Sequence, residues 1–293
     1  MANLRDIKRR INSVKSTQKI TRAMKMVAAS KLRRAQEAIQ QARPYAYGMR
    51  DLLHSLANCA DSDAHPLMRS SNGEGVVALI VVTSDRGLCG GFNANIINKA
   101  LATLRKEFKG RDVELTLVGR KGVEALRRQS ELTVQDSYIG HDSGSVMRAA
   151  SDVMSGIIAR FLEGAVDEVH VLYNEFKSAM QQDVTLERLL PFNMETIQAG
   201  DDEEVPVKPL DYIYEPAQAV VLDSLLEKDL NIQMHRVLME STASEHGARM
   251  SAMDAATRNA GEMIDSLTLK YNRVRQDAIT TELIEVISGA EAL

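Results

Sequence analysis

Aromatic residues are scarce in this sequence: they make up 4% of its 293 residues, and tryptophan is absent. Alanine, leucine, methionine, lysine, arginine and glutamate are abundant instead, which is typical of helix-rich chains. We therefore expect more helix than an average globular protein contains.

Cysteine is almost as rare, since Cys59 and Cys89 are the only two. They are too few and too far apart for a disulfide framework or a four-ligand zinc site, so both are predicted to be ordinary thiols in a reducing compartment. The six histidines show no metal-ligand spacing such as H-E-x-x-H, and the sequence lacks a G-x-S-x-G motif. We expect no metal ion, no cofactor and no covalent catalysis.

Long hydrophobic runs are also missing. The longest, Val76 to Val82, has the length of a strand, whereas a membrane-spanning helix needs roughly 18 apolar residues. The first residues carry no apolar segment of the kind found in secretory signals. The chain is therefore not expected to insert into a membrane.

Charge is unevenly distributed, although the net charge is only −4. Residues 1–34 hold eleven Lys and Arg against one acid, Asp6, whereas the chain after Gln276 contains acids and no Lys or Arg. A basic helix can bind nucleic acid, but this one has no aromatic residue for base stacking before Tyr45. A solvated helix flank, or a face for an acidic protein partner, is the favoured interpretation.

A heptad pattern covers the first part of the chain. Thirteen of its sixteen seam positions are apolar, which predicts a coiled-coil helix over residues 1–58, with Pro44 causing only a kink. At the three polar positions we expect the neighbouring stripe of Ile20, Met24 and Val27 to take over, so that the face shown to a partner rotates. The seam runs Leu4, Ile7, Ile11, Val14, Gln18, Thr21, Lys25, Ala28, Leu32, Ala35, Ile39, Ala42, Ala46, Met49, Leu53 and Leu56.

The last part of the chain, residues 216–293, has no proline after Pro216 and is predicted to be one long helix. Its apolar residues again follow three-four spacing, so the two arms should form a long antiparallel coiled coil. The alternative is two ordinary core helices. Antiparallel pairing would bring together residues whose numbers sum to about 272 and would leave the helix unpaired beyond about Tyr271. The second seam includes Leu222, Leu225, Ile232, Met239, Ala243, Met250, Met253, Ala260, Ile264, Leu267, Tyr271, Val274 and Ala278.

The middle of the chain alternates short apolar runs with helical patterns, which predicts a mostly parallel α/β domain over residues 76–198. A linker at 59–75 should precede it, and an acidic, proline-containing loop at 199–215 should follow it. The predicted strands are Val76–Val82, Glu114–Val118, Glu168–Tyr173 and a closing strand near Thr185–Pro191. The predicted helices are Phe92–Phe108, Lys121–Gln129 and Ser145–Gly164.

The turn from Thr83 to Asn93 follows a buried strand and opens a helix, which is where α/β sheets bind phosphates. It has neither the G-K-S/T of a phosphate-binding loop nor G-x-G-x-x-G spacing. We therefore favour glycines that allow tight packing, and keep a nucleotide-binding enzyme and a nucleic-acid-binding coiled coil as competing functions.

Three segments resemble the gamma chain of the F-type ATP synthases. The first runs from Ile11 to Lys31 (I-x-S-V-x-x-T-Q-K-I-T-x-A-M-x-M-V-A-A-S-K), and the second is S-D-R-G-L-C-G-G-F-N from Ser84 to Asn93. The third begins E-S-x-A-S-E-H-x-A-R-M at Glu240 and ends Y-N-x-x-R-Q-x-x-I-T-x-E-x-x-E at Glu285. Chloroplast members carry an inserted pair of regulatory cysteines that this sequence lacks, which favours a bacterial source.

The resemblance implies a non-catalytic rotor shaft, because the family's reaction, ADP plus phosphate to ATP, occurs in the beta subunits. Its implied partners are the alpha and beta subunits of the catalytic hexamer, the epsilon subunit and the membrane c-ring, and neither nucleic acid nor a cofactor is expected. The implied location is the cytoplasmic face of the bacterial inner membrane, as a peripheral part of the complex. By resemblance, the face that couples rotation to catalysis comprises Met24, Lys25, Arg249, Gln276, Thr280, Glu282 and Glu285.

Overall fold

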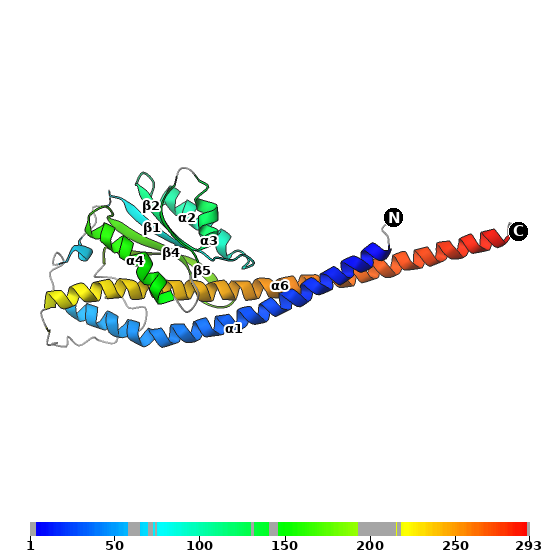
Figure 1. Ribbon diagram of the computed structural model, residues 1–293, viewed down its shortest axis with the longest axis horizontal. Helices are drawn as coiled ribbons and strands as arrows, with labels where there is room; N and C mark the ends of the chain where they lie inside the picture. The colour runs from blue at the N-terminus through cyan, green and yellow to red at the C-terminus, as the bar shows by residue number, and fades with distance from the viewer. Residues whose placement is uncertain are drawn as a thin grey trace. The chain divides into compact units, whose positions relative to one another are not determined.

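The computed structural model describes residues 4–57, 65–69, 73, 75–129, 132–140, 146–192, 215 and 218–291. It contains two compact units, one made of residues 1–29 with 249–293 and the other of residues 30–248. Two long helices, α1 (Leu4–Ala57) and α6 (Gln218–Glu291), contribute to both units (Figure 1).

The unit of residues 30–248 is built on a five-stranded sheet of order β3-β2-β1-β4-β5. The first four strands in the chain run parallel, and β5 returns antiparallel to β4 as a hairpin. This confirms the mostly parallel α/β domain predicted from the alternating pattern. The strands are β1 (Val77–Val82), β2 (Val113–Val118), β3 (Thr133–Tyr138), β4 (Glu168–Phe176) and β5 (Gln182–Leu190).

Strand β3 was not predicted, and its composition explains why. Its sequence, T-V-Q-D-S-Y, is mostly polar and mostly exposed, because the strand lies at one edge of the sheet. An edge strand of this kind lacks the continuous apolar run by which buried parallel strands are recognised.

Helices cover both faces of the sheet (Figure 1), and they lie where the sequence predicted helices, with ends within a few residues of the expected ones. Alternate residues of β1 face opposite sides, as strand geometry requires. Val77, Leu79 and Val81 join the core under α2 and α3, whereas Ala78, Ile80 and Val82 join the core under α4 and α6. The helices are α2 (Phe92–Lys106), α3 (Arg120–Leu126) and α4 (Val146–Leu162), with a short 3-10 turn, η1, at Pro66–Met68.

Within this unit, α6 is surrounded by other elements: every residue from 229 to 248 is buried or half-buried. At Gly247 the backbone of the β4–β5 hairpin approaches closely, since a Cβ added there would lie 3.3 Å from Cα of Ala179. A glycine inside a helix weakens it by about 1 kcal/mol, and here it admits this neighbour.

In the other unit, α1 and α6 pair antiparallel, and both predicted seams lie in their interface. The α1 seam residues up to Ala28 are all buried or half-buried, and so are the α6 seam residues from Met250 to Ala278. The face that α1 turns toward α6 does not rotate: Ile20 and Val27 are each 58% exposed, and Met24 is half-buried. The polar seam residues stay in the interface by bonding across it: Thr21 Oγ1 lies 2.8 Å from Thr257 Oγ1, and Gln18 Nε2 donates to the Thr257 carbonyl at 3.4 Å.

The register of the pair differs from the predicted one. Residues bonded across the seam have numbers that sum to between 275 and 279, as for Gln18 with Thr257 and Lys25 with Asp254, rather than to about 272. Pairing therefore extends further along α6, and Tyr271, Val274 and Ala278 are still half-buried. From Ile279 to Ser288 every residue is exposed.

Candidate functional site

Three of the seven predicted coupling residues lie at one end of the helix pair in the unit of residues 1–29 with 249–293. Lys25, a seam residue of α1, forms an ion pair with Asp254 of α6, which also pairs with Arg258. The hydrogen bond and charge of Lys25 hold the pKa of Asp254 below its usual range. Met24 and Arg249 are half-buried. Sequence reasoning missed Asp254 and Thr257, although a lysine on a coiled-coil seam is a signal that a counter-charge stands opposite.

The other four lie near the C-terminal end of α6 and are exposed. Gln276 and Thr280 are one turn apart, and the Thr280 hydroxyl donates to the Gln276 carbonyl at 2.9 Å. Glu282 and Glu285 follow three residues apart, so their carboxylates lie on one side of the helix.

The structure does not bring the seven residues into one patch. Asp254, the partner of Lys25, and Gln276 are separated by 22 residues of one continuous helix, which is about 33 Å at 1.5 Å per residue. The predicted coupling residues therefore lie on two separate surfaces of this unit, one near Lys25 and one near Gln276.

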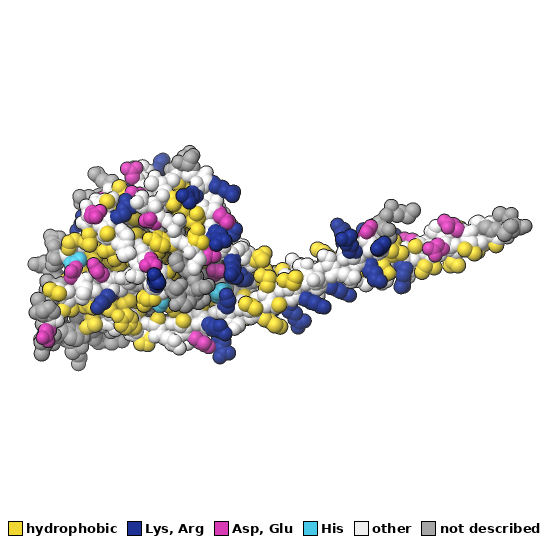
Figure 2. Space-filling view, viewed as in Figure 1, with side chains coloured by type: hydrophobic (Ala, Val, Ile, Leu, Met, Phe, Trp, Pro, Cys, Tyr) yellow, Lys and Arg dark blue, Asp and Glu magenta, His cyan; other side chains and the backbone are white. Residues whose placement is uncertain are grey.

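The surface near Gln276, which we call the distal surface, lies toward the end of α6. There the helix carries exposed aliphatic side chains among acidic ones (Figure 2). Isolated apolar side chains are normal on a surface, but a run of large ones on an unpaired helix marks an interaction site. Five are at least half exposed: Ile279, Leu283, Ile284, Val286 and Ile287.

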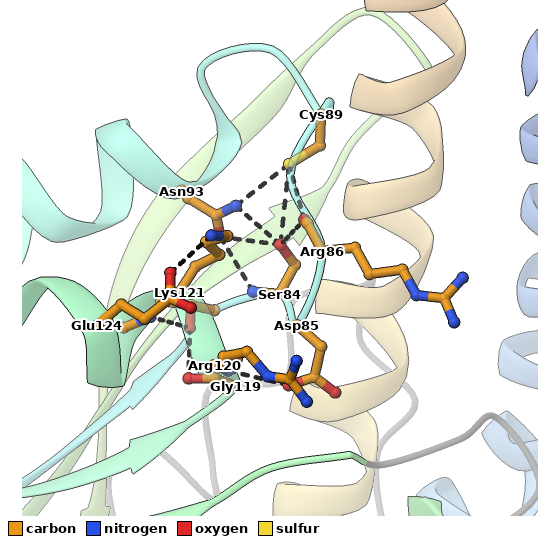
Figure 3. Close-up of polar contacts among 11 residues, drawn as sticks. Ser84, Asp85, Arg86, Cys89, Asn93, Gly119, Arg120, Lys121 and Glu124 are labelled. Atoms are coloured by element: carbon orange, nitrogen blue, oxygen red, sulfur yellow. Dashed lines mark hydrogen bonds and ion pairs between the residues drawn. The ribbon is translucent and has the colours of Figure 1, made fainter.

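The turn after β1 is held by a dense network of its own hydrogen bonds (Figure 3). Asn93 at the start of α2 accepts from the Ser84 amide at 3.0 Å, and its side-chain amide donates to Ser84 Oγ at 2.8 Å and to Cys89 Sγ at 3.3 Å. Ser84 Oγ donates to the Arg86 carbonyl at 2.7 Å. The polar groups of the turn therefore satisfy one another.

Asp85 links the turn after β1 to the segments that follow β2 and β3. Its carboxylate accepts from the backbone amides of Arg120 and Gly140, each at 2.9 Å. The Arg120 amide belongs to the start of α3, so this carboxylate lies at α3 and not at the start of α2, where the sequence suggested a phosphate. The tight-packing expectation is met only in part: a Cβ at Gly91 would lie 3.2 Å from the Asn95 side chain, whereas nothing lies within 4 Å of one at Gly87.

Cys89 is a packing residue: it is 2% exposed and clusters with Phe92 and Ala248. This agrees with the ordinary thiol predicted from the sequence. Cys59 lies outside the described residues.

Among the residues that the structure describes, no group of three or more His, Cys, Asp and Glu side chains is placed to hold a metal ion. Nor does any helix among these residues have the length and apolar character that crossing a membrane requires.

Comparison with known proteins gives matches along the whole chain. The family model described as ATP synthase matches residues 3–293. The ATP synthase gamma chain of Geobacter sp. (strain M21) is 52% identical over 295 residues, covering 100% of this chain and 99% of its own. That of Rhizobium johnstonii is 46% identical over 297 residues, covering 100% of both chains.

Solved structures give the same result. A chain of the Tetrahymena thermophila mitochondrial ATP synthase central stalk and c-ring is 27% identical, with a TM-score of 0.62, over 81% of this chain and 99% of that one. A chain of the Euglena gracilis mitochondrial ATP synthase rotor shares the fold, with a TM-score of 0.64, over 94% of this chain and 98% of that one at 17% identity. This chain belongs to the gamma-chain family of the F-type ATP synthases.

Proposed function

We propose that this chain is the central shaft of a bacterial F-type ATP synthase and is itself non-catalytic. It would turn inside a hexamer of alpha and beta subunits, join the epsilon subunit and the c-ring, and couple proton-driven rotation to ATP synthesis or hydrolysis. Its place would be the cytoplasmic face of the inner membrane. The resemblance and the full-length relatives support this role.

The observation that carries the proposal is the end of α6. Ile279, Leu283 and Ile287 are exposed on a helix that has left its partner, and burying such side chains provides a strong drive for association. An apolar sleeve formed by the hexamer would cover them. A protein that acts alone gains nothing from such a surface.

The mechanism follows from asymmetry. Changing the population ratio of two conformations of a catalytic site from 1:99 to 99:1 requires a partner that binds one conformation about 5.5 kcal/mol more tightly than the other. A shaft supplies this preference when it presents different faces to sites that are otherwise equivalent. Each exposed charge contributes about 0 to 1 kcal/mol, so the coupling must be shared among many contacts on the two surfaces near Lys25 and Gln276.

Co-purification tests the proposal directly. The chain, carrying an affinity tag, should recover alpha and beta subunits in hexameric excess from the cells that produce it, and the recovered complex should hydrolyse ATP. The isolated chain should neither hydrolyse nor bind ATP. Nucleotide binding by the isolated chain would favour the enzyme alternative, and steeply salt-dependent DNA binding would favour the nucleic-acid alternative.

A further inference from the structure

A cluster of polar side chains joins α6 to the β4–β5 hairpin in the unit of residues 30–248. The guanidinium of Arg236 donates to Glu187 Oε1 at 2.6 Å, to Glu240 Oε1 at 3.3 Å and to the Tyr173 hydroxyl at 3.3 Å. The Tyr173 hydroxyl in turn donates to Glu187 Oε2 at 3.1 Å. Helix and hairpin are thus connected by bonds that share one arginine.

The hairpin follows the same side of α6 beyond this cluster. The charge of Glu175 on β4 acts on Glu240, one turn after Arg236. Further along the helix, the hairpin turn approaches Gly247, where an added Cβ would lie 3.3 Å from the Ala179 carbonyl oxygen. Arg236 and Gly247 are eleven residues apart, which is about 16 Å of helix.

The contact of α6 with the sheet is apolar as well as polar. The core side of this helix contributes Leu230, Met234 and Val237, whose close packing itself resists rotation of the helix. A guanidinium adds a directional contact, because its planar fork holds carboxylates in one geometry. Partly buried ion pairs add little to stability, and their best-attested role is to specify one register.

The charges around Arg236 show what its loss would do. Glu187 and Glu240 pair with it directly, and Glu175, which pairs with Lys177, acts on Glu240, so three acids here face two bases. Burial raises the pKa of Glu240, and Arg236 opposes that rise. Without the arginine, the carboxylates of helix and hairpin would repel each other across the contact.

We propose that Arg236 is a positioning residue that holds the β4–β5 hairpin to α6 against rotation about the helix axis. The sheet and α6 then turn as one body, and force applied to either element reaches the other. The inference rests on the rotor function proposed above and adds the contact through which the sheet and the helix transmit torque.

The test uses the assembled enzyme in membrane vesicles, with ATP hydrolysis and proton pumping measured together. The triple variant Arg236→Met, Glu187→Gln, Glu240→Gln removes the charges and keeps side-chain volume, so the chain should fold and melt within a few degrees of wild type. Hydrolysis should continue while protons pumped per ATP fall several-fold. Arg236→Lys, which keeps the charge but loses the fork, should give an intermediate ratio.

The matched control is Arg160→Met with Glu114→Gln. That pair, at 2.5 Å, is similarly half-buried in the same unit but joins α4 to β2, and its loss should leave the ratio unchanged. A wild-type ratio in the folded triple variant would overturn the proposal, as would an equal loss in the control. If the triple variant does not fold, Glu187→Gln alone takes its place, with the same two outcomes. A wild-type chain that fails to assemble or couple would count against the rotor function, a separate result.

Discussion

The hydroxyls of Thr21 and Thr257 lie 2.8 Å apart across the seam between α1 and α6. Thr21 is buried, and Thr257 also donates to the Met253 carbonyl at 2.7 Å. Thr21 Oγ1 also lies 3.1 Å from the Gln18 carbonyl, so each hydroxyl has an acceptor in its own helix. The bond across the seam is an additional one that forms only in this register, which therefore is favoured over its neighbours.

The first prediction concerns this pair. Thr21→Val leaves Thr257 with one partner fewer and should lower the free energy of unfolding by about 1 kcal/mol, and Thr257→Val should do the same. The double variant restores a matched, apolar pair and should lie near wild type, so the two effects are not additive. Urea unfolding of the isolated chain, followed by circular dichroism, measures all four proteins.

Thr268→Val is the matched control, because the exposed Thr268 makes the same bond to the carbonyl four residues earlier, at 2.7 Å to Ile264. It should change stability by less than about 0.5 kcal/mol. If the double variant costs the sum of the two single variants, the hydroxyl pair has no special role.

The second prediction is a pH dependence. Lys25 lowers the pKa of Asp254 in the folded chain, so this carboxylate stabilises the fold above its unfolded pKa of about 3.9 and stops doing so as the pH falls through the folded value. Asp254→Asn should therefore be less stable than wild type at pH 7 and equal to it near pH 2. Added salt should reduce the stability difference between Asp254→Asn and wild type at pH 7, because the Lys25–Asp254 pair is partly exposed.

Unfolding curves at pH 7, 5 and 2 check this. Asp265→Asn makes the same substitution at an exposed position of the same helix, and its difference from wild type at pH 7 should be much smaller. A gap for Asp254→Asn that persists at pH 2 would show that the side chain acts through something other than its charge.

The third prediction concerns Gly119, which follows β2 and lies against the turn after β1. Gly119 has φ of +95°, and a Cβ there would lie 2.2 Å from the carbonyl oxygen of Thr83. Gly119→Ala should lower the free energy of unfolding by more than about 2 kcal/mol. Gly87→Ala is the control, since nothing lies within 4 Å of its added Cβ. Equal melting temperatures for the two variants would contradict the prediction.

The fourth prediction concerns the end of α6. Amides from about Ile279 to Ile287 should exchange quickly in the isolated chain, because this stretch is exposed on every side. Assembly with alpha and beta subunits should slow them by at least about tenfold. Residues 253–260 of the paired part serve as an internal reference and should be protected in both states. Strong protection of the tail in the isolated chain would show that it folds back on its own body.

The fifth prediction addresses the distal surface. Glu282→Gln together with Glu285→Gln should leave the melting of the isolated chain unchanged, since both side chains are exposed. In the assembled enzyme ATP synthesis should fall, by at most about fivefold per charge. Glu262→Gln, exposed in the paired part of the same helix, should have no such effect. Wild-type synthesis in the double variant would remove these two residues from the coupling face.

Local pattern determined much of this structure. The heptads of both arms, and the apolar runs of β1, β2, β4 and β5, predicted the elements that the structure contains, because burial imposes a period on each of them. The resemblance to the gamma chain needed only the sequence, because long ordered strings of residues carry it.

Only the tertiary structure decided which groups meet. Strand β3 is held by its neighbour β2 rather than by its own composition, and the pairing of Thr21 with Thr257 sets a register that helix length could not. Nothing in the sequence distinguishes Arg236 from the other charged residues of the long helix, because its partner Glu187 is far away in the chain. Such contacts depend on the geometry between elements, whereas a sequence period reports only which face of each element is buried.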